Sequence, residues 1–222
     1  MPEAGDGRVI TEVDESIKQV LGAVLGRGEV ELVFDAPTTD WAARRSGPTI
    51  DAFLYDIRED VRRRENGVVE RRSDDGMVRT RSRPARYFKL SYLLTAWVQR
   101  PEDEHRLLDR MLASFDRLDA LPAGTLTGSL AAIASPVPVS IALPPPEDRA
   151  FADVWSSLGG ELKPSLDLVV IAPSVADVAL PLGPPVLHRP TGEIRALDGS
   201  VVERLERPAR PERPQRPLRR AR

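Results

Sequence analysis

The sequence predicts an α+β fold, in which a mixed, largely antiparallel sheet is packed with two to three helices. Three observations support this prediction. Segments with apolar residues at helical spacing occur between shorter apolar runs that are typical of buried strands. Their order is helix, strand, strand, strand, helix, strand, helix, strand. Apolar residues make up 41% of the 222 residues and charged residues 30%, which is the composition of a folded globular body.

The first half of the chain supplies one long helix and three strands. Residues 9–25 carry apolar side chains at three- and four-residue steps and are predicted to form an amphipathic helix. Short strands are expected over residues 30–34 and 49–57, with a polar loop between them. Residues 86–98 form the clearest strand. Because this strand is apolar on both faces, we expect it at the centre of the sheet.

The second half contributes two helices and two strands. A second long helix is expected to begin at Pro101, because proline suits the first helical position and three acidic residues follow it in the first turn. Residues 137–143 predict another strand, and the three prolines 144–146 lead into a third helix that ends at Gly159. Residues 166–172 predict the last buried strand.

Beyond residue 180 the composition changes. Short runs at residues 186–188, 193–196 and 201–205 are separated by turn signals and predict a small β meander. The end of the chain repeats arginine at every third position with prolines between, which is the spacing of an extended polyproline II segment. We therefore expect a disordered N-terminus (residues 1–8), an α+β domain (9–180), a small β extension (181–206) and an Arg/Pro-rich tail (207–222).

The net charge of −2 conceals two opposite contributions. The tail holds seven arginines and one glutamate and carries +6, so residues 1–206, with 25 basic and 33 acidic side chains, carry −8. Residues 58–86, called the arm below, hold ten arginines against six acids. Such basic segments attract acidic surfaces, and a second copy of the chain offers one. The candidate interface residues are Arg62, Arg63, Arg64, Arg79, Arg81 and Arg83 in the arm and Arg207, Arg210, Arg213, Arg216, Arg219 and Arg222 in the tail.

Catalytic and cofactor sites are not indicated. The chain contains no cysteine, which excludes disulfides, thiolate nucleophiles and cysteine-based zinc sites. Only His105 and His188 could serve in a serine-histidine system, and no G-x-S-x-G motif accompanies them. His105 is spaced with Asp109 for metal ligation, but a solvated histidine among acidic residues is the preferred interpretation. We therefore predict a non-enzymatic protein with no catalytic residue, no cofactor and no metal site.

Two other functions stay open as alternatives. A nucleic-acid-associated protein would neutralise phosphates with the arm and the tail, but no aromatic residue lies between Ile57 and Tyr87 to stack on bases, so this function is not favoured. A small hydrolase would need one of the two histidines and a nucleophile that the sequence does not indicate. The simplest structural interpretations are a solvated two-stranded arm and a basic tail with no specific contact.

No membrane partner is expected either. The longest apolar stretches, residues 137–143 and 166–172, are far shorter than the ~20 apolar residues that a membrane-spanning helix needs. The N-terminus lacks the basic start and the apolar segment of an export signal. These features predict a cytoplasmic location.

Five segments occur in an order and spacing that resemble a known family. They are Val30–Pro37, Ile50–Glu59, Leu90–Ala96, Val154–Trp155 and Leu162–Leu166. Over roughly residues 9–180 the chain resembles the cap, or tail-terminator, proteins of extracellular contractile injection systems, which are phage-tail-like particles. These segments are strand and turn patterns rather than catalytic signatures, so the resemblance concerns fold and assembly.

The resemblance implies a tail-terminator-like fold and a structural assembly protein. Such a protein forms a hexameric ring at the particle end opposite the baseplate, where it terminates the inner tube and anchors the last layer of sheath. The implied partners are further copies of the chain and the tube and sheath subunits, within a particle assembled in the cytoplasm. In this interpretation the arm faces an acidic surface of a neighbour or of the tube end, and the tail reaches an adjoining copy or the sheath.

Overall fold

The computed structural model describes residues 8–25, 28, 30–72, 78–133, 135–144, 151–174 and 191–206. The chain divides into two compact units, Met1–Pro181 and Leu182–Arg222, which are described separately. Three sequence-based expectations fall outside the described residues. They concern the N-terminus up to residue 7, the short run at residues 186–188 and the Arg/Pro-rich tail.

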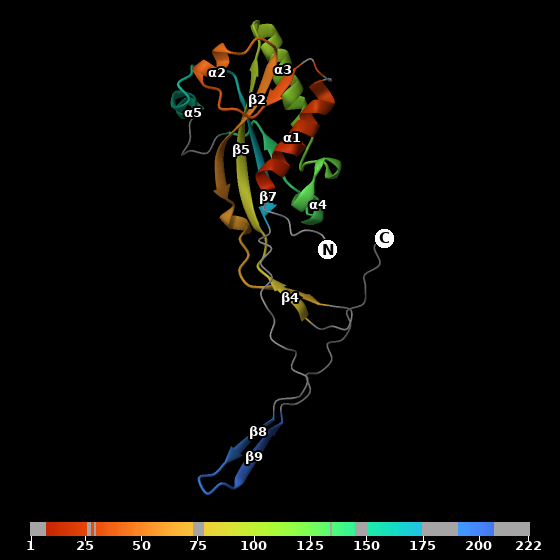
Figure 1. The fold of residues 1–222 in the computed structure, drawn as a ribbon, viewed down its shortest axis with the longest axis vertical. Helices are drawn as coiled ribbons and strands as arrows, with labels where there is room; N and C mark the ends of the chain where they lie inside the picture. The colour runs from red at the N-terminus through yellow and green to blue at the C-terminus, as the bar shows by residue number, and fades with distance from the viewer. Residues whose placement is uncertain are drawn as a thin grey trace. The chain divides into compact units, whose positions relative to one another are not determined.

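A five-stranded sheet forms the centre of the first unit, with the strand order β1-β2-β5-β7-β6 (Figure 1). β1 (Glu31–Val33) runs parallel to β2 (Thr49–Glu59), and every other pair of neighbours is antiparallel. β5 (Arg86–Trp97) is the middle strand, followed by β7 (Leu166–Ser174) and β6 (Val139–Ile141). The prediction of a mixed, largely antiparallel sheet is therefore confirmed, with the strand that is apolar on both faces at its centre.

Helices cover both faces of this sheet. α1 (Val9–Leu25), α3 (Pro101–Phe115) and α4 (Gly128–Ile133) lie on one face, and α2 (Thr39–Ala43) and α5 (Phe151–Ser157) lie on the other (Figure 1). α1, α3 and α5 were predicted from sequence. Two single-turn 3₁₀ helices, η1 (Val61–Arg63) and η2 (Ala123–Thr125), complete the described helical segments of this unit.

Two short helices differ from the sequence-based expectation. The segment predicted as a polar loop between β1 and β2 contains α2, where the Thr38 hydroxyl accepts a hydrogen bond from the Trp41 backbone N–H at 3.2 Å. α4, of six residues, was not predicted at all. One or two turns are too short for an apolar period to show in the sequence. Both helices depend instead on tertiary burial of one side chain each, Trp41 in α2 and Leu130 in α4.

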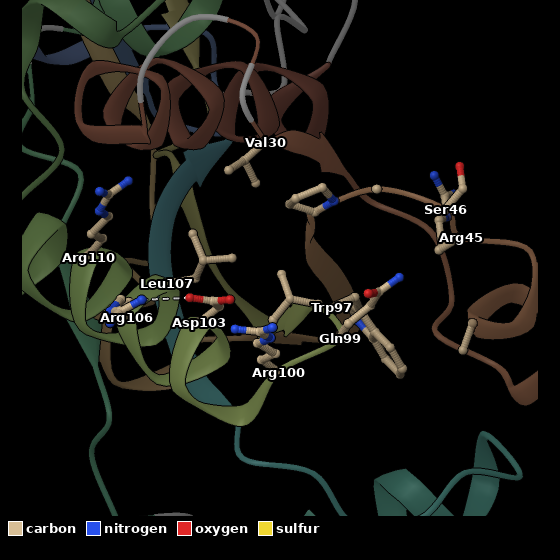
Figure 2. A pocket seen from close by; sticks show the side chains of 14 residues that line it. Val30, Arg45, Ser46, Trp97, Gln99, Arg100, Asp103, Arg106, Leu107 and Arg110 are labelled. Atoms are coloured by element: carbon tan, nitrogen blue, oxygen red, sulfur yellow. Dashed lines mark hydrogen bonds and ion pairs between the residues drawn. The ribbon is translucent and has the colours of Figure 1, made fainter.

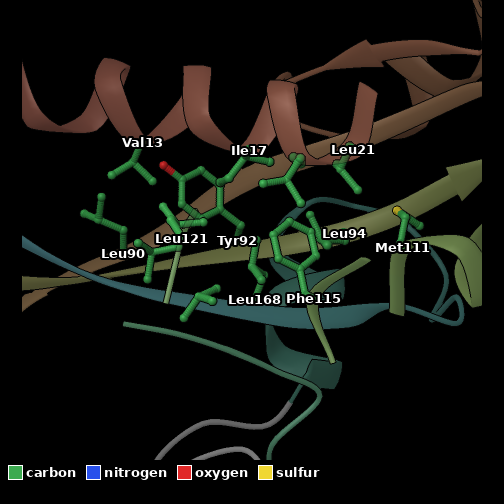
Figure 3. Packing of buried hydrophobic residues seen from close by; sticks show 14 of the residues in the cluster. Val13, Ile17, Leu21, Leu90, Tyr92, Leu94, Met111, Phe115, Leu121 and Leu168 are labelled. Carbon is green, nitrogen blue, oxygen red and sulfur yellow. The ribbon is translucent and has the colours of Figure 1, made fainter. Parts of the chain in front are cut away.

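The main core lies between the α1 face of the sheet and the helices above it. Val13, Ile17 and Leu21 of α1 are fully buried and point toward Tyr92 and Leu94 of β5 (Figure 3). Burying one such aliphatic side chain contributes about 1.5–3 kcal/mol. The apolar residues at three- and four-residue steps that predict α1 are therefore the same residues that pack this helix against the sheet.

A second, smaller layer covers the opposite face of the sheet. The ring centroid of Trp97 in β5 lies 5.2 Å from that of Trp41 in α2 and 6.4 Å from that of Trp155 in α5. The Trp41 indole N–H donates to Asp35 at 2.8 Å, and the Trp97 indole N–H donates to the Thr95 hydroxyl at 2.8 Å. This aromatic layer packs α2 and α5 against the sheet, and these two short helices have little stability of their own.

Asp51 lies on the same face of β2, opposite Thr95 in the strand register. Its side chain is fully buried, and neither carboxylate oxygen has a hydrogen-bond partner among the described residues. Burial, and then the negative charge of Asp35, raise the pKa of Asp51 to about 8. The carboxyl group therefore carries its proton in the folded protein at neutral pH.

Two hairpins form two-stranded sheets of their own. β3 (Val69–Arg72) and β4 (Val78–Ser82) form an antiparallel pair within the arm. In the second unit, β8 (Thr191–Arg195) and β9 (Val201–Glu206) form another pair around a turn at Gly199, whose φ of +84° suits glycine. Two of the three runs predicted as a meander are thus paired as a hairpin.

Candidate functional site

The arm arginines lie around the end of β2 and along the hairpin β3–β4. Three of the predicted residues form ion pairs within the chain: Arg63 with Asp60, Arg64 with Glu59, and Arg81 with Glu70. Arg62 and Arg83 are exposed and form no ion pair with the described residues. The side chain of Arg79 and all the tail arginines lie outside the described part of the chain.

Glu59, the last residue of β2, neutralises more than one cation of the arm. Arg64 donates from Nε to one Glu59 oxygen at 2.8 Å and also contacts the second oxygen, and Arg86 approaches the carboxylate at 3.3 Å. The hydrogen bond from Arg64 lowers the pKa of Glu59, so this carboxylate stays ionised. The surface of the arm is therefore less cationic than its composition predicts.

Exposed aliphatic side chains accompany these arginines. Ile57 in β2 is 51% exposed, Val61 in η1 (Val61–Arg63) is 65% exposed, and Val68 and Val69 at the start of β3 are 50% and 43% exposed. Sequence reasoning treated this segment through its charges alone, although the consecutive valines after Gly67 were a visible signal. The arm thus combines apolar side chains with free guanidinium groups, a mixture common at protein–protein interfaces.

A groove lined by arginine lies between the segment after α2 and the start of α3 (Figure 2). Its volume is about 770 Å³. Arg45 is held by Glu31 at 3.0 Å and Asp35 at 2.8 Å, and Arg106 is held by Asp103 at 2.7 Å.

Arg100 and Arg110 also line the groove, and neither forms an ion pair with the described residues. Val30, Trp97 and Leu107 add apolar surface to it (Figure 2). The groove is therefore suited to an acidic group that also carries apolar surface. Sequence reasoning missed it because only the tertiary structure brings Val30 and Arg45 beside the three arginines of residues 100–110.

The described residues contain no group of three or more His, Asp or Glu side chains placed to hold a metal ion. His105 lies exposed on α3, and His188 lies outside the described residues. None of the described helices has the length and apolar character that crossing a bilayer requires.

Comparison with protein families shows the family to which this chain belongs. The model of the Pvc16 N-terminal domain matches residues 12–188. The chain belongs to the Pvc16 N-terminal domain family. This match spans the whole five-stranded sheet and, apart from the first three residues of α1, the helices on both of its faces. Comparison with curated proteins gives no match.

Two solved structures share the fold of this family member. The PVC sheath/tube terminator of an extracellular contractile injection system, in its extended state, aligns with a TM-score of 0.64 and 20% identity over 88% of this chain. The tube-terminating cap of the anti-feeding prophage aligns with a TM-score of 0.57 and 23% identity over 82% of this chain. The alignments cover 66% and 61% of those two chains, which is less than two thirds of their length.

Proposed function

We propose that this chain caps one end of a contractile injection system as a structural, non-enzymatic subunit. In this role it ends the inner tube and holds the last layer of sheath. The observation that carries the proposal is the family match across residues 12–188. The likeness in fold to a sheath/tube terminator and to a tube-terminating cap supports it.

We further propose that the subunits form a hexameric ring at the end opposite the baseplate, on particles assembled in the cytoplasm. A closed ring needs two different, complementary surfaces on each subunit, because every contact is head to tail. The arm, with exposed aliphatic side chains beside Arg62 and Arg83, is one surface of the required kind. The groove beside Arg100 and Arg110 is cationic like the arm, so we assign it to an acidic region of the tube or sheath and not to the contact between copies.

The capping role predicts a change in particle length. Particles assembled without the chain should have tubes of uncontrolled length and should lose their sheath, because nothing ends the tube or holds the final layer. Electron microscopy of particles made with and without the chain measures both properties, and a tagged chain should be found at one end only. Normal length and full sheath retention without the chain would contradict the proposed function.

Reversing the free charges of the arm should weaken the ring. The double variant Arg62→Glu and Arg83→Glu should dissociate at several-fold lower ionic strength than the unaltered chain, since exposed charge contacts are screened by salt. The mass of the assembly, measured over a salt series, reports the effect. Arg117→Glu, a reversal at an exposed position after α3, is the matched control and should assemble normally.

An unchanged hexamer mass in the double variant would count against the role of the arm. Removing residues 207–222 tests the tail in the same way, with sheath retention as the measurement.

Tight binding of duplex DNA that falls steeply with salt would instead favour the nucleic-acid alternative.

A further inference from the structure

The arginine-lined groove beside α3 contains two cationic side chains that are not neutralised. Arg100 is the N-cap residue of α3, and Arg110 lies in the third turn of this helix. Both are exposed, and neither forms an ion pair with the residues that the structure describes. Figure 2 shows them following one another along α3, with Val30 on the opposite side of the groove. At a rise of about 1.5 Å per residue, the two positions lie roughly 15 Å apart along the helix axis.

The groove carries a net positive charge. Its lining includes four arginines, and Asp103 is the one acidic residue among the described residues that line it. The two arginines other than Arg100 and Arg110 are held by carboxylates of the chain itself. An anionic partner therefore meets Arg100 and Arg110, with the apolar side chain of Leu107 in the same lining. In an extended chain, at about 3.3 Å per residue, carboxylates four or five residues apart match this spacing.

The lining favours an acidic peptide over a nucleic acid. Binding of single strands uses aromatic rings on which bases stack. Trp97 is the aromatic residue among the described lining residues, and its ring is packed within the chain by Trp41 and Trp155. The ammonium group of Lys163 lies 5.1 Å from its centroid as well. The Trp97 ring is therefore not free to stack on a base, and Asp103 would repel a phosphate backbone.

We propose that the groove holds an extended acidic segment of the sheath subunit. Two carboxylates of the segment pair with Arg100 and Arg110, and an apolar side chain between them packs against Val30 and Leu107. A guanidinium group binds a carboxylate through two parallel hydrogen bonds, and the apolar contact removes further surface from water. This joint rests on the proposed function, in which the chain holds the last layer of sheath.

The shape of the site indicates the sheath rather than the tube. A contractile sheath changes the position of its subunits relative to the cap, so the joint between them must tolerate movement. A linear segment in a groove keeps its contacts while the body of its subunit moves. Ending the tube requires instead a broad face that covers the last layer of tube subunits. A groove of about 770 Å³ suits the first task.

Peptide binding to the purified full-length chain tests the groove. Overlapping fluorescent peptides that cover the sheath and tube subunits of the same particle are the probes, and anisotropy measures their binding. We expect an acidic sheath peptide to bind, and the double variant Arg100→Glu and Arg110→Glu should bind it about tenfold more weakly. The double variant Arg62→Glu and Arg83→Glu makes the same change of charge at exposed positions of the arm. This control should bind the peptide like the unaltered chain.

A third variant should change the affinity in the opposite direction. Asp103→Asn removes the acidic residue of the lining and releases Arg106, which Asp103 holds at 2.7 Å. It should therefore bind the same sheath peptide several-fold more tightly. Damage to the fold does not produce tighter binding, so this result would distinguish a binding site from a structural role of these charges.

Assembled particles separate the groove from the capping role. Particles made with Arg100→Glu and Arg110→Glu should have tubes of normal length but should lose sheath from the capped end, as seen by electron microscopy. If no sheath peptide binds, or if this variant binds the peptide and retains sheath like its control, the groove proposal is wrong while the capping role stands. Binding of tube peptides or of duplex DNA in place of sheath peptides would overturn the sheath as partner. Normal length and sheath in the absence of the chain would overturn the capping role itself.

Discussion

Asp51→Asn should make the protein more stable at pH 8 and should leave its stability almost unchanged at pH 4. Asp51 is fully buried without a hydrogen-bond partner among the described residues. Its pKa is raised from 3.8 to about 8 by burial first and by Asp35 second. The unfolded chain releases the proton at its ordinary pKa, so the unfolded state gains stability as the pH rises from about 4 to 8.

The direction of this effect follows from the raised pKa. The folded protein binds more protons than the unfolded chain between the two pKa values, so the free energy of unfolding falls across that range and is constant above it. Asparagine has a similar shape but no titratable proton. The free energy of unfolding of the variant should therefore not fall across this pH range. The difference at pH 8 should be on the order of a few kcal/mol.

Urea unfolding of both proteins at pH 4, 6 and 8 measures the predicted difference. Asp153→Asn, an exposed position on α5, is the matched control and should give curves like those of the unaltered chain. Parallel stability curves for the unaltered chain and Asp51→Asn would show that the Asp51 carboxyl group does not titrate as its burial requires.

Gly128→Ala should cost about 3 kcal/mol of folding stability, because it breaks the junction between α1 and α4. The Glu12 carboxylate of α1 accepts hydrogen bonds from the Ser129 backbone N–H at 2.9 Å, the Ser129 hydroxyl at 2.6 Å and the Leu130 N–H at 3.1 Å. It thereby satisfies the free N–H groups that begin α4. A Cβ on Gly128 would lie 2.1 Å from a Glu12 oxygen.

Two separate costs make up this loss. The φ of Gly128 is +53°, a conformation that costs a side-chain-bearing residue about 1 kcal/mol or more. Displacing the carboxylate also weakens hydrogen bonds to a charged group, which contribute roughly 1.5–3 kcal/mol. Gly124→Ala is the control, because a Cβ there meets nothing within 4 Å and no positive φ is involved.

A double-mutant cycle shows whether the two residues act together. Glu12→Ala removes the same hydrogen bonds, so Gly128→Ala should cost clearly less in that background than in the unaltered chain. The free energies of unfolding of the four proteins, from urea titration, provide the coupling. If the losses of stability from the two substitutions add exactly, Gly128→Ala does not act through the Glu12 hydrogen bonds. The prediction would then be wrong.

Sequence reasoning succeeded where a pattern repeats along one element. The helical stripe of α1 and the two apolar faces of β5 extend over 17 and 12 residues, long enough for their periods to be read. The segments that carry the family resemblance lie largely in and around those strands. α2 and α4 were missed because one or two turns show no period, and because Trp41 and Leu130 are buried by partners distant in sequence.

The sequence indicated the charges of the candidate interface, but arginine counts do not show which charges are already paired. Glu70 and Arg81 are eleven residues apart and meet only through the register of β3 and β4. The exposure of Ile57 and Val69 is likewise a feature of the folded chain rather than of local composition.

The sequence by itself determined the elements of the sheet, their order and the family to which the chain belongs, because periodicity and the order of motifs are local properties. Only the tertiary structure decided that Asp51 is buried without a hydrogen-bond partner among the described residues, and that Arg64 and Arg81 are neutralised. The physical reason is that burial, ion pairing and strand register each depend on residues brought together from distant parts of the chain.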